Sequence, residues 1–319
     1  MPVINTSNLM DFCGWGRVDA KTPRERILEA QRESQAVAAQ FAKPFFIAGQ
    51  TESGAGKCAR LHKAVQKVTG KPLDIDPQLT GDCVAASARM TAAIRGCFEI
   101  ASGDFEVFKR LFNPFHYATG RVLIGKNRLK GGAGSIGGWQ AQANAQFGFL
   151  AQEKNGGIAY SKAIADAWGD DRKFQGKSFR DFLDLATESK LQTWAPVQSW
   201  NESRDSLYHG YPLTIGSNRG YTMKPDRDGF HRPSGTWPHQ LTIYSFWENV
   251  KVPAVGIVNT WGDVHGVTKD PENGEELPRG TILVRLEDFV KYHLTPNAEC
   301  LAYSDIDGFD AEIDWSAFG

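Results

Sequence analysis

Cys83 is the residue most able to do chemistry. It follows the segment from Gln78 to Asp82 and is the first residue of a run rich in alanine and serine. That run has the composition of a buried helix, so we expect Cys83 in its first turn. Unpaired backbone N–H groups and the positive end of the helix dipole stabilise a thiolate there. The N–H of Cys83 and the side-chain amide of Gln78 could both stabilise an oxyanion. A small buried cysteine among alanines is the competing interpretation.

A cysteine nucleophile needs a base, and the base needs a group that orients it. His239 opens a predicted strand, and Asn259 ends an apolar run twenty residues later, so antiparallel pairing would place imidazole beside carboxamide. The Asn carbonyl oxygen accepts an imidazole N–H and fixes the tautomer without adding charge. Trp261 would cover that contact and exclude water. His231, in a loop with glycine and proline, is the competing base.

In chain order and local context these residues resemble the papain-like cysteine peptidases. That family has a glutamine, a cysteine at a helix start, a histidine on a strand and an Asn-Ser-Trp-Gly motif, which reads Asn-Thr-Trp-Gly here from residue 259 to 262. Gly137 and Gly138 look like the double glycine whose backbone lines the family's substrate cleft. Residues 210–215 look like the strand that begins its β lobe. The resemblance covers roughly residues 76–305.

The resemblance implies a role for each matching residue. The catalytic set would be the nucleophile Cys83, the general acid and base His239, the orienting residue Asn259 and the oxyanion donor Gln78. The substrate-binding set would be Gly137, Gly138 and Trp261. The fold implied is α+β and papain-like, with a helical lobe built on the cysteine helix and an antiparallel, β-barrel-like lobe.

Several positions depart from the family pattern. Gln78 precedes Cys83 by five positions where plant and animal members have six, so the oxyanion loop is shorter. Thr80 stands in place of a cysteine, which removes a disulfide and suits a reducing compartment. His265 replaces a second tryptophan, and Asp82 would oppose the thiolate unless its side chain caps the helix. These departures imply a divergent bacterial or phage-type member.

The elements that must position these residues fall into a helical half and a strand-rich half. Apolar spacing and composition predict helices over residues 23–43, 60–67, 83–98 and 139–147, and one within 178–191. Short apolar runs between turn residues predict strands at 213–215, 241–246, 254–258 and 281–286. This order predicts an α+β fold in two lobes. We expect residues 1–75 to form an N-terminal extension and residues 76–319 the papain-like domain.

Composition narrows the function classes. Basic residues number 36 and acidic residues 37, so bulk charge indicates no nucleic-acid partner. No apolar run approaches the roughly 20 residues of a membrane span, and the first fifteen residues lack a secretory-signal pattern. Five scattered cysteines without a CxxC pair argue against a disulfide framework and a thiolate zinc site. We expect a cytoplasmic protein, or a virion-associated one if phage-encoded, with no cofactor and no membrane partner.

The leading hypothesis is thiol-dependent hydrolysis of peptide or isopeptide bonds in a peptide or protein substrate, through an acyl-enzyme on Cys83. The alternative from another class is an inactive papain-like binding or structural protein, for example a virion or assembly component. The sequence does not distinguish hydrolysis from acyl transfer, nor exclude a cell-wall peptide as substrate. Residues 1–75 could regulate the enzyme by occupying the cleft, or could bind a protein partner.

Overall fold

The structure is a computed structural model, and it describes residues 4, 7–16, 23–43, 53–75 and 77–310. The α-helices are α1 (Pro23–Phe41), α2 (His62–Thr69), α3 (Cys83–Ser102), α4 (Asn113–Ala118), α5 (Gly137–Phe147), α6 (Lys162–Gly169), α7 (Leu183–Ala186), α8 (Trp200–Tyr208) and α9 (Leu286–His293). Shorter helical turns are η1 (Leu9–Phe12), η2 (Thr119–Ile124), η3 (Gln152–Lys154) and η4 (Phe179–Phe182). The strands are β1 (Cys58–Arg60), β2 (Glu106–Val107), β3 (Lys190–Leu191), β4 (Trp194–Pro196), β5 (Leu213–Tyr221), β6 (Pro233–Trp247), β7 (Ala254–Val258), β8 (Thr281–Arg285), β9 (Ala298–Tyr303), β10 (Ile306–Asp307) and β11 (Phe309–Asp310).

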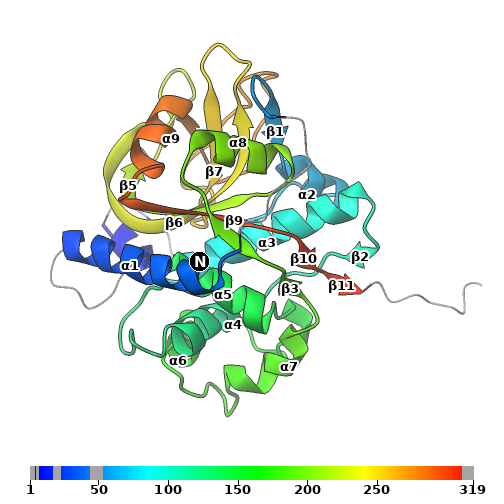
Figure 1. Cartoon of the computed structure of the whole chain (residues 1–319), viewed down its shortest axis with the longest axis vertical. Coiled ribbons are helices and arrows are strands. Elements are labelled where there is room, and N and C mark those ends of the chain that lie inside the picture. Colours follow the sequence, from blue (N-terminus) through cyan, green and yellow to red (C-terminus); the bar gives the residue numbers. More distant parts are fainter. Residues whose placement is uncertain (1–3, 5–6, 17–22, 44–52, 76, 311–319) are drawn as a thin grey trace, which may run out of the picture.

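The alanine-rich run forms α3, which lies at the centre of the molecule (Figure 1). Fourteen of its twenty residues are buried, because neighbouring elements contact it on most sides. Small side chains allow β6 to approach so closely that the Ser87 hydroxyl donates to the carbonyl of Leu241 at 2.6 Å. The helix ends at Gly103, whose φ of 118° is a left-handed conformation that favours glycine. The predicted buried helix beginning at Cys83 is confirmed.

A seven-stranded antiparallel sheet builds the other lobe. Its strand order is β4-β9-β5-β6-β7-β8, and β1 pairs with β6 off this path. The largest apolar cluster joins the sheet to the helices around it, with Val65 of α2, Ile94 of α3, Leu207 of α8 and Phe289 of α9 packed against its strands. Figure 1 shows α8 and α9 beside the sheet, and α4, α6 and α7 in the opposite half. The predicted α+β architecture in two lobes is confirmed.

Some elements differ from the prediction. Only the short turns η4 and α7 form within residues 178–191, because the chain turns there into β3. The helices α4, α6, α8 and α9 were not predicted, although α8 begins with a capping box in which Ser199 and Glu202 bond each other's backbone N–H groups. β5 and β6 extend well beyond their predicted cores, to nine and fifteen residues.

Part of the expected N-terminal extension joins the body of the protein. β1 adds a strand to the sheet through β6, and α2 packs against α3. The division into an extension of residues 1–75 and a domain of residues 76–319 stays a prediction. Among the helices that the structure describes, none is both long and apolar enough to cross a membrane.

Candidate active site

Cys83 is the first residue of α3, and its side chain is completely buried. The preceding residue, Asp82, makes no side-chain cap on this helix. Its carboxylate instead accepts hydrogen bonds from the Tyr160 hydroxyl at 2.5 Å and from the Asn113 amide at 2.6 Å. Burial raises the pKa of Asp82 to about 6, against the pull of these two donors. The carboxylate beside the candidate nucleophile is therefore held by the helical lobe.

His239 and Asn259 meet at the ends of two paired strands. β6 and β7 are antiparallel with Thr242 opposite Val258, so the residue after Val258 comes level with the strand positions just before Thr242. His239 Nε2 and Asn259 Oδ1 lie 2.9 Å apart in a hydrogen bond, and both side chains are buried. The Trp261 ring lies 4.5 Å from the His239 ring, centroid to centroid. The structure thus brings together these three predicted residues.

His231, the competing base, is committed to the sheet. Its Nδ1 accepts the backbone N–H of Leu283 on β8 at 3.2 Å, and its Nε2 bonds the carbonyl of His265 at 3.2 Å. Both ring nitrogens are therefore used, and neither can take a proton from Cys83 without breaking a buried hydrogen bond.

Gln78 is buried, and both ends of its side-chain amide have partners. Nε2 donates to the carbonyls of Phe12 at 2.6 Å and Thr80 at 2.7 Å. Oε1 accepts from the Thr260 hydroxyl at 2.8 Å, which ties Gln78 to the residue after Asn259. A carbonyl from the N-terminal part of the chain thus occupies the donor that we predicted for a substrate oxyanion.

Residues 13–16, called here the cleft segment, run between the two lobes beside this site. Trp15 N–H donates to the carbonyl of Pro238, the neighbour of His239, at 2.9 Å. On the helical side, the N–H and carbonyl of Ser135 bond the residues before and after Trp15, at 2.9 and 3.1 Å. Main-chain groups of both lobes therefore hold residues 14–16 between them.

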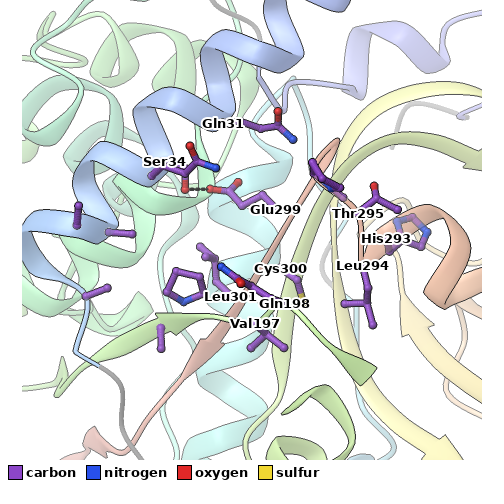
Figure 2. Close-up of a pocket in the computed structure, with 18 residues that line it drawn as sticks. Gln31, Ser34, Val197, Gln198, His293, Leu294, Thr295, Glu299, Cys300 and Leu301 are labelled. Atoms are coloured by element: carbon purple, nitrogen blue, oxygen red, sulfur yellow. Dashed lines mark hydrogen bonds between the residues drawn. The ribbon is translucent and has the colours of Figure 1, made fainter. Parts of the chain in front are cut away.

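The indole of Trp15 is buried against Glu299 of β9. Its Nε1 donates to the Glu299 carboxylate at 2.8 Å. The same carboxylate accepts the backbone N–H groups of Gly137 at 3.0 Å and Gly138 at 2.8 Å, and the hydroxyl of Ser34 on α1. Figure 2 shows Ser34 and Glu299 pointing toward each other. The two predicted cleft glycines thus open α5 and bind Glu299, while Ser135 pairs with the cleft segment.

A cavity of about 690 Å³ adjoins this carboxylate (Figure 2). Its walls are α1, the chain at residues 195–198, and the stretch from the end of α9 into β9. Ser34 and Glu299 form part of its lining, so the carboxylate that bonds the Trp15 indole also faces this cavity.

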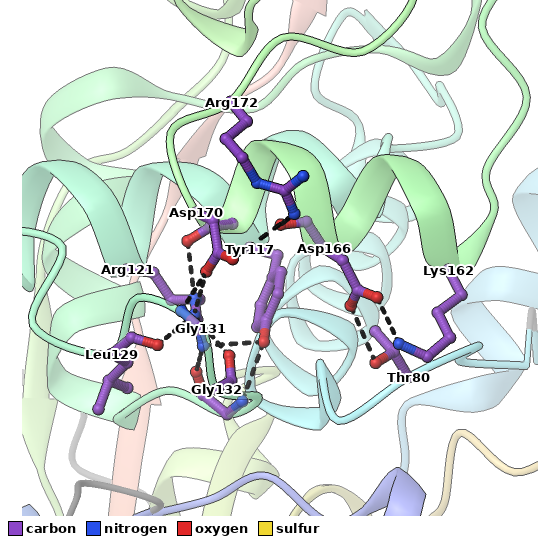
Figure 3. Close-up of polar contacts among 12 residues, drawn as sticks. Thr80, Tyr117, Arg121, Leu129, Gly131, Gly132, Lys162, Asp166, Asp170 and Arg172 are labelled. Carbon is purple, nitrogen blue, oxygen red and sulfur yellow. Dashed lines mark hydrogen bonds and ion pairs between the residues drawn. The ribbon is translucent and has the colours of Figure 1, made fainter.

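A buried arginine fixes the loop that carries Ser135. Arg121 is 1% exposed and donates to the carbonyls of Leu129 at 2.8 Å, Gly132 at 2.7 Å and Gly134 at 2.6 Å. The Tyr117 hydroxyl accepts the N–H of Gly134 at 2.9 Å. Figure 3 shows Arg121 beside Leu129, Gly131 and Gly132 of this loop. Because so many carbonyls share one guanidinium, the helical wall of the cleft is held in place from inside the protein.

Burial decides the charge state of the two candidate reacting groups. It raises the pKa of Cys83 to about 12, although backbone N–H groups of Gln240, Gly14 and Trp15 oppose the rise. It lowers the pKa of His239 to about 4, against the hydrogen bond to Asn259. With the cleft segment in place, thiol and imidazole are therefore both neutral near pH 7. Within the described part of the chain, Nδ1 of His239 has no hydrogen-bond partner.

Three residues of this site were not predicted from the sequence: Trp15, Ser135 and Glu299. A signal for the first was present, since Trp15 stands between two glycines. A Cβ at Gly14 would lie 2.0 Å from the carbonyl oxygen of Gly81, so the chain can pass this point only with glycine. Glu299 gave no signal, because an acidic residue in a short apolar strand reads as a solvent-facing position.

No family model matches the chain, and no curated protein matches it by sequence. In structure it is similar to xylellain, a cysteine protease from Xylella fastidiosa, at 13% identity and a TM-score of 0.54, over 93% of this chain and 97% of that one. It is also similar to procathepsin B of Trypanosoma congolense, at 11% identity and a TM-score of 0.52, over 96% and 99% of the two chains. The ragweed pollen cysteine protease Amb a 11, in its proform, matches at 14% identity and a TM-score of 0.51, over 85% of this chain and 73% of that one.

These likenesses show the fold. The chain has the papain-like α+β architecture, with a central cysteine helix in one lobe and an antiparallel sheet in the other, as predicted. At 11 to 14% identity the fold is what the likeness establishes.

Proposed function

We propose that the protein is a thiol-dependent hydrolase of peptide or isopeptide bonds. The observation that carries the proposal is the main-chain pairing of the cleft segment. Pro238 and Ser135 hold residues 14–16 next to Cys83 and His239 through backbone groups alone. A cleft that binds main chain in this way suits a peptide or protein substrate, because every peptide offers the same donors and acceptors.

In the proposed mechanism, Cys83 attacks the scissile carbonyl carbon and His239 takes the thiol proton on Nδ1. Asn259 holds the ring by accepting its Nε2–H. The N–H of Cys83 and the side-chain amide of Gln78 stabilise the oxyanion. His239 then protonates the leaving amine, and water hydrolyses the acyl group from the sulfur. Trp261 covers the imidazole and carboxamide, which strengthens their contact by excluding water.

The cleft segment would hold this enzyme closed. Phe12, just before it, contributes the carbonyl that occupies the Gln78 amide, and the backbone of Gly14 and Trp15 lies against Cys83. Displacement of the segment together with Phe12 would release one of the two bonds that Gln78 Nε2 donates, and would return water to the thiol, which lowers the pKa of Cys83 toward its ordinary range.

An inactive binding or structural protein is the second candidate. The fully buried neutral thiol and the engaged amide of Gln78 favour it, since both must change before catalysis. For location we propose a reducing compartment such as the cytoplasm, or a virion if the chain is phage-encoded. The five free thiols support this choice. A bacterial or phage source stays a prediction, as does a protein partner for the N-terminal residues.

The test compares peptide turnover in full-length chains that carry Trp15→Ala to open the cleft. Adding Cys83→Ala should reduce turnover of a mixed fluorogenic peptide library by about a thousandfold or more. Cys97→Ala is the matched control, because it makes the same change on the same helix at another buried cysteine. Equal turnover with and without Cys83 would refute the assignment. Peptide binding without any turnover that depends on Cys83 would establish the second candidate.

A further inference from the structure

The carboxamide of Asn259 has a second partner beyond His239. Its Nδ2 lies 2.8 Å from Nε2 of His265, six residues further along the chain. His239, Asn259 and His265 are all buried, at 2%, 0% and 0% exposure. A continuous hydrogen-bonded row of three side chains therefore runs from the candidate base into the sheet lobe.

With the Asn259 amide in this orientation, donor and acceptor chemistry fixes the direction of every bond in the row. An amide nitrogen only donates, so Nε2 of His265 must offer a lone pair and carry no hydrogen. The amide oxygen of Asn259 then faces His239 and requires a hydrogen on its Nε2. That leaves the lone pair of His239 on Nδ1, the nitrogen needed to take the Cys83 proton. With the amide reversed, His239 would carry its hydrogen on Nδ1 and could not act as the base.

The position of His265 is itself fixed. Because Nδ1 of His231 accepts the Leu283 N–H, Nε2 of His231 carries the hydrogen and donates it to the carbonyl of His265. The rings of His265 and Trp261 stack with an angle of 21° between their planes. Burial also lowers the pKa of His265 to about 3, so its ring stays neutral and its lone pair remains available.

We propose that His265 is a positioning residue, whose Nε2 lone pair sets the orientation of the Asn259 amide and thereby the tautomer of His239. Its consequence for catalysis rests on the proposed function. The identity of residue 265 matters in this account, because an indole N–H donates and offers no lone pair to Nδ2 of Asn259. The histidine in place of a tryptophan is therefore a functional part of the site in this chain.

The first test reads the tautomers directly, by heteronuclear NMR of the imidazole nitrogens in the full-length chain. We expect hydrogen on Nε2 of His239 and on Nδ1 of His265. In His265→Phe, which keeps a ring and removes the acceptor, the Nδ1–H form of His239 should become populated. In His265→Gln, which keeps an acceptor oxygen, the wild-type tautomer should return. A hydrogen on Nε2 of His265 in the wild type, or an unchanged His239 in His265→Phe, would overturn the proposal.

The second test is a double-mutant cycle on the rate at which a small haloacetamide alkylates Cys83, in full-length Trp15→Ala. At neutral pH we expect His265→Phe to slow alkylation by about tenfold, and to have no effect when Asn259→Ala is also present. An equal loss in both backgrounds would mean that His265 acts only as scaffold. Alkylation needs no peptide hydrolysis, so failure of the proposed function would show separately, as absent turnover with the coupling intact.

Discussion

The ionisable groups on the two walls of the cleft have pKa values that are shifted in opposite directions. On the helical wall, burial raises the pKa of both Asp82 and Cys83. On the sheet wall, burial lowers the pKa of both His239 and His265. The cause is the same, since desolvation favours the neutral form of any group. The helical wall is therefore most stable at low pH and the sheet wall at higher pH, and the closed cleft is a state in which every candidate reacting group is uncharged.

The walls also differ in what completes them. The row of hydrogen bonds on the sheet wall, from His239 through Asn259 to His265, uses only residues of that lobe. The helical wall depends on the cleft segment and on Phe12 before it. Phe12 accepts from Gln78, the backbone of Gly14 and Trp15 lies against Cys83, and the Trp15 indole donates to Glu299. Opening the cleft should thus change the thiol far more than the imidazole.

The largest effect should come from Trp15→Ala. Trp15 is 1% exposed, and removing a buried tryptophan costs about 3 to 5 kcal/mol. The substitution destabilises the state in which the cleft segment covers Cys83, so the thiol is exposed more often. Alkylation of Cys83 near pH 7 should therefore become about a hundredfold faster or more. The rate is measured with a small haloacetamide, and the labelled site is identified by peptide mapping. Trp200→Ala, a half-buried tryptophan on α8, is the control for general destabilisation. Equal acceleration in both variants would contradict an anchoring role for Trp15.

On the sheet wall, His265→Phe should change how stability depends on pH. The lowered pKa of His265 means that unfolding takes up a proton between about pH 3 and pH 6.5, so stability is full above pH 6.5 and falls as the pH drops through this window. At pH 4, this one group lowers the free energy of unfolding by about 3 kcal/mol relative to its value above pH 6.5. In the variant, the slope of unfolding free energy against pH should decrease by about 1.4 kcal/mol per pH unit in this range. Denaturant titrations at several pH values measure it, and an unchanged slope would show that His265 is not buried as a neutral ring.

The parts of the site that the sequence could predict are those fixed by residues close together in the chain. Cys83 and its helix were accessible because a local run of small residues specifies a buried helix beginning at one point. The approach of His239 to Asn259 followed from the pairing of two strands close together in sequence. Glu299 and Trp15 are 284 residues apart, and no periodicity links positions at that distance. Their contact depends on how the whole sheet lies against α5, which is a property of tertiary packing.

His265 lies between these cases. The sequence showed that a histidine stands where a tryptophan was expected, but the residue type alone did not reveal an acceptor role. That role depends on a hydrogen bond to a side chain six residues away, in a loop after β7 where local rules set no direction. In a row of buried polar side chains, the hydrogen-bonding role of each member depends on its partners. Short segments of sequence do not show which partners the fold will bring together.

The smallest expected effect concerns Asp82 on the helical wall. After burial, the charge of Asp82 is a further influence that raises the pKa of Cys83. Asp82→Asn removes that charge and keeps an oxygen that can accept from Tyr160 and Asn113. In the open Trp15→Ala chain, water screens the interaction, so the thiolate fraction and the alkylation rate at pH 7 should rise only about threefold. Asp104→Asn, just beyond the far end of α3, makes the same charge change as a control. A lower alkylation rate in Asp82→Asn would mean that the carboxylate favours the thiolate through its hydrogen-bonded neighbours. The charge of Asp82 would then not raise the pKa of Cys83.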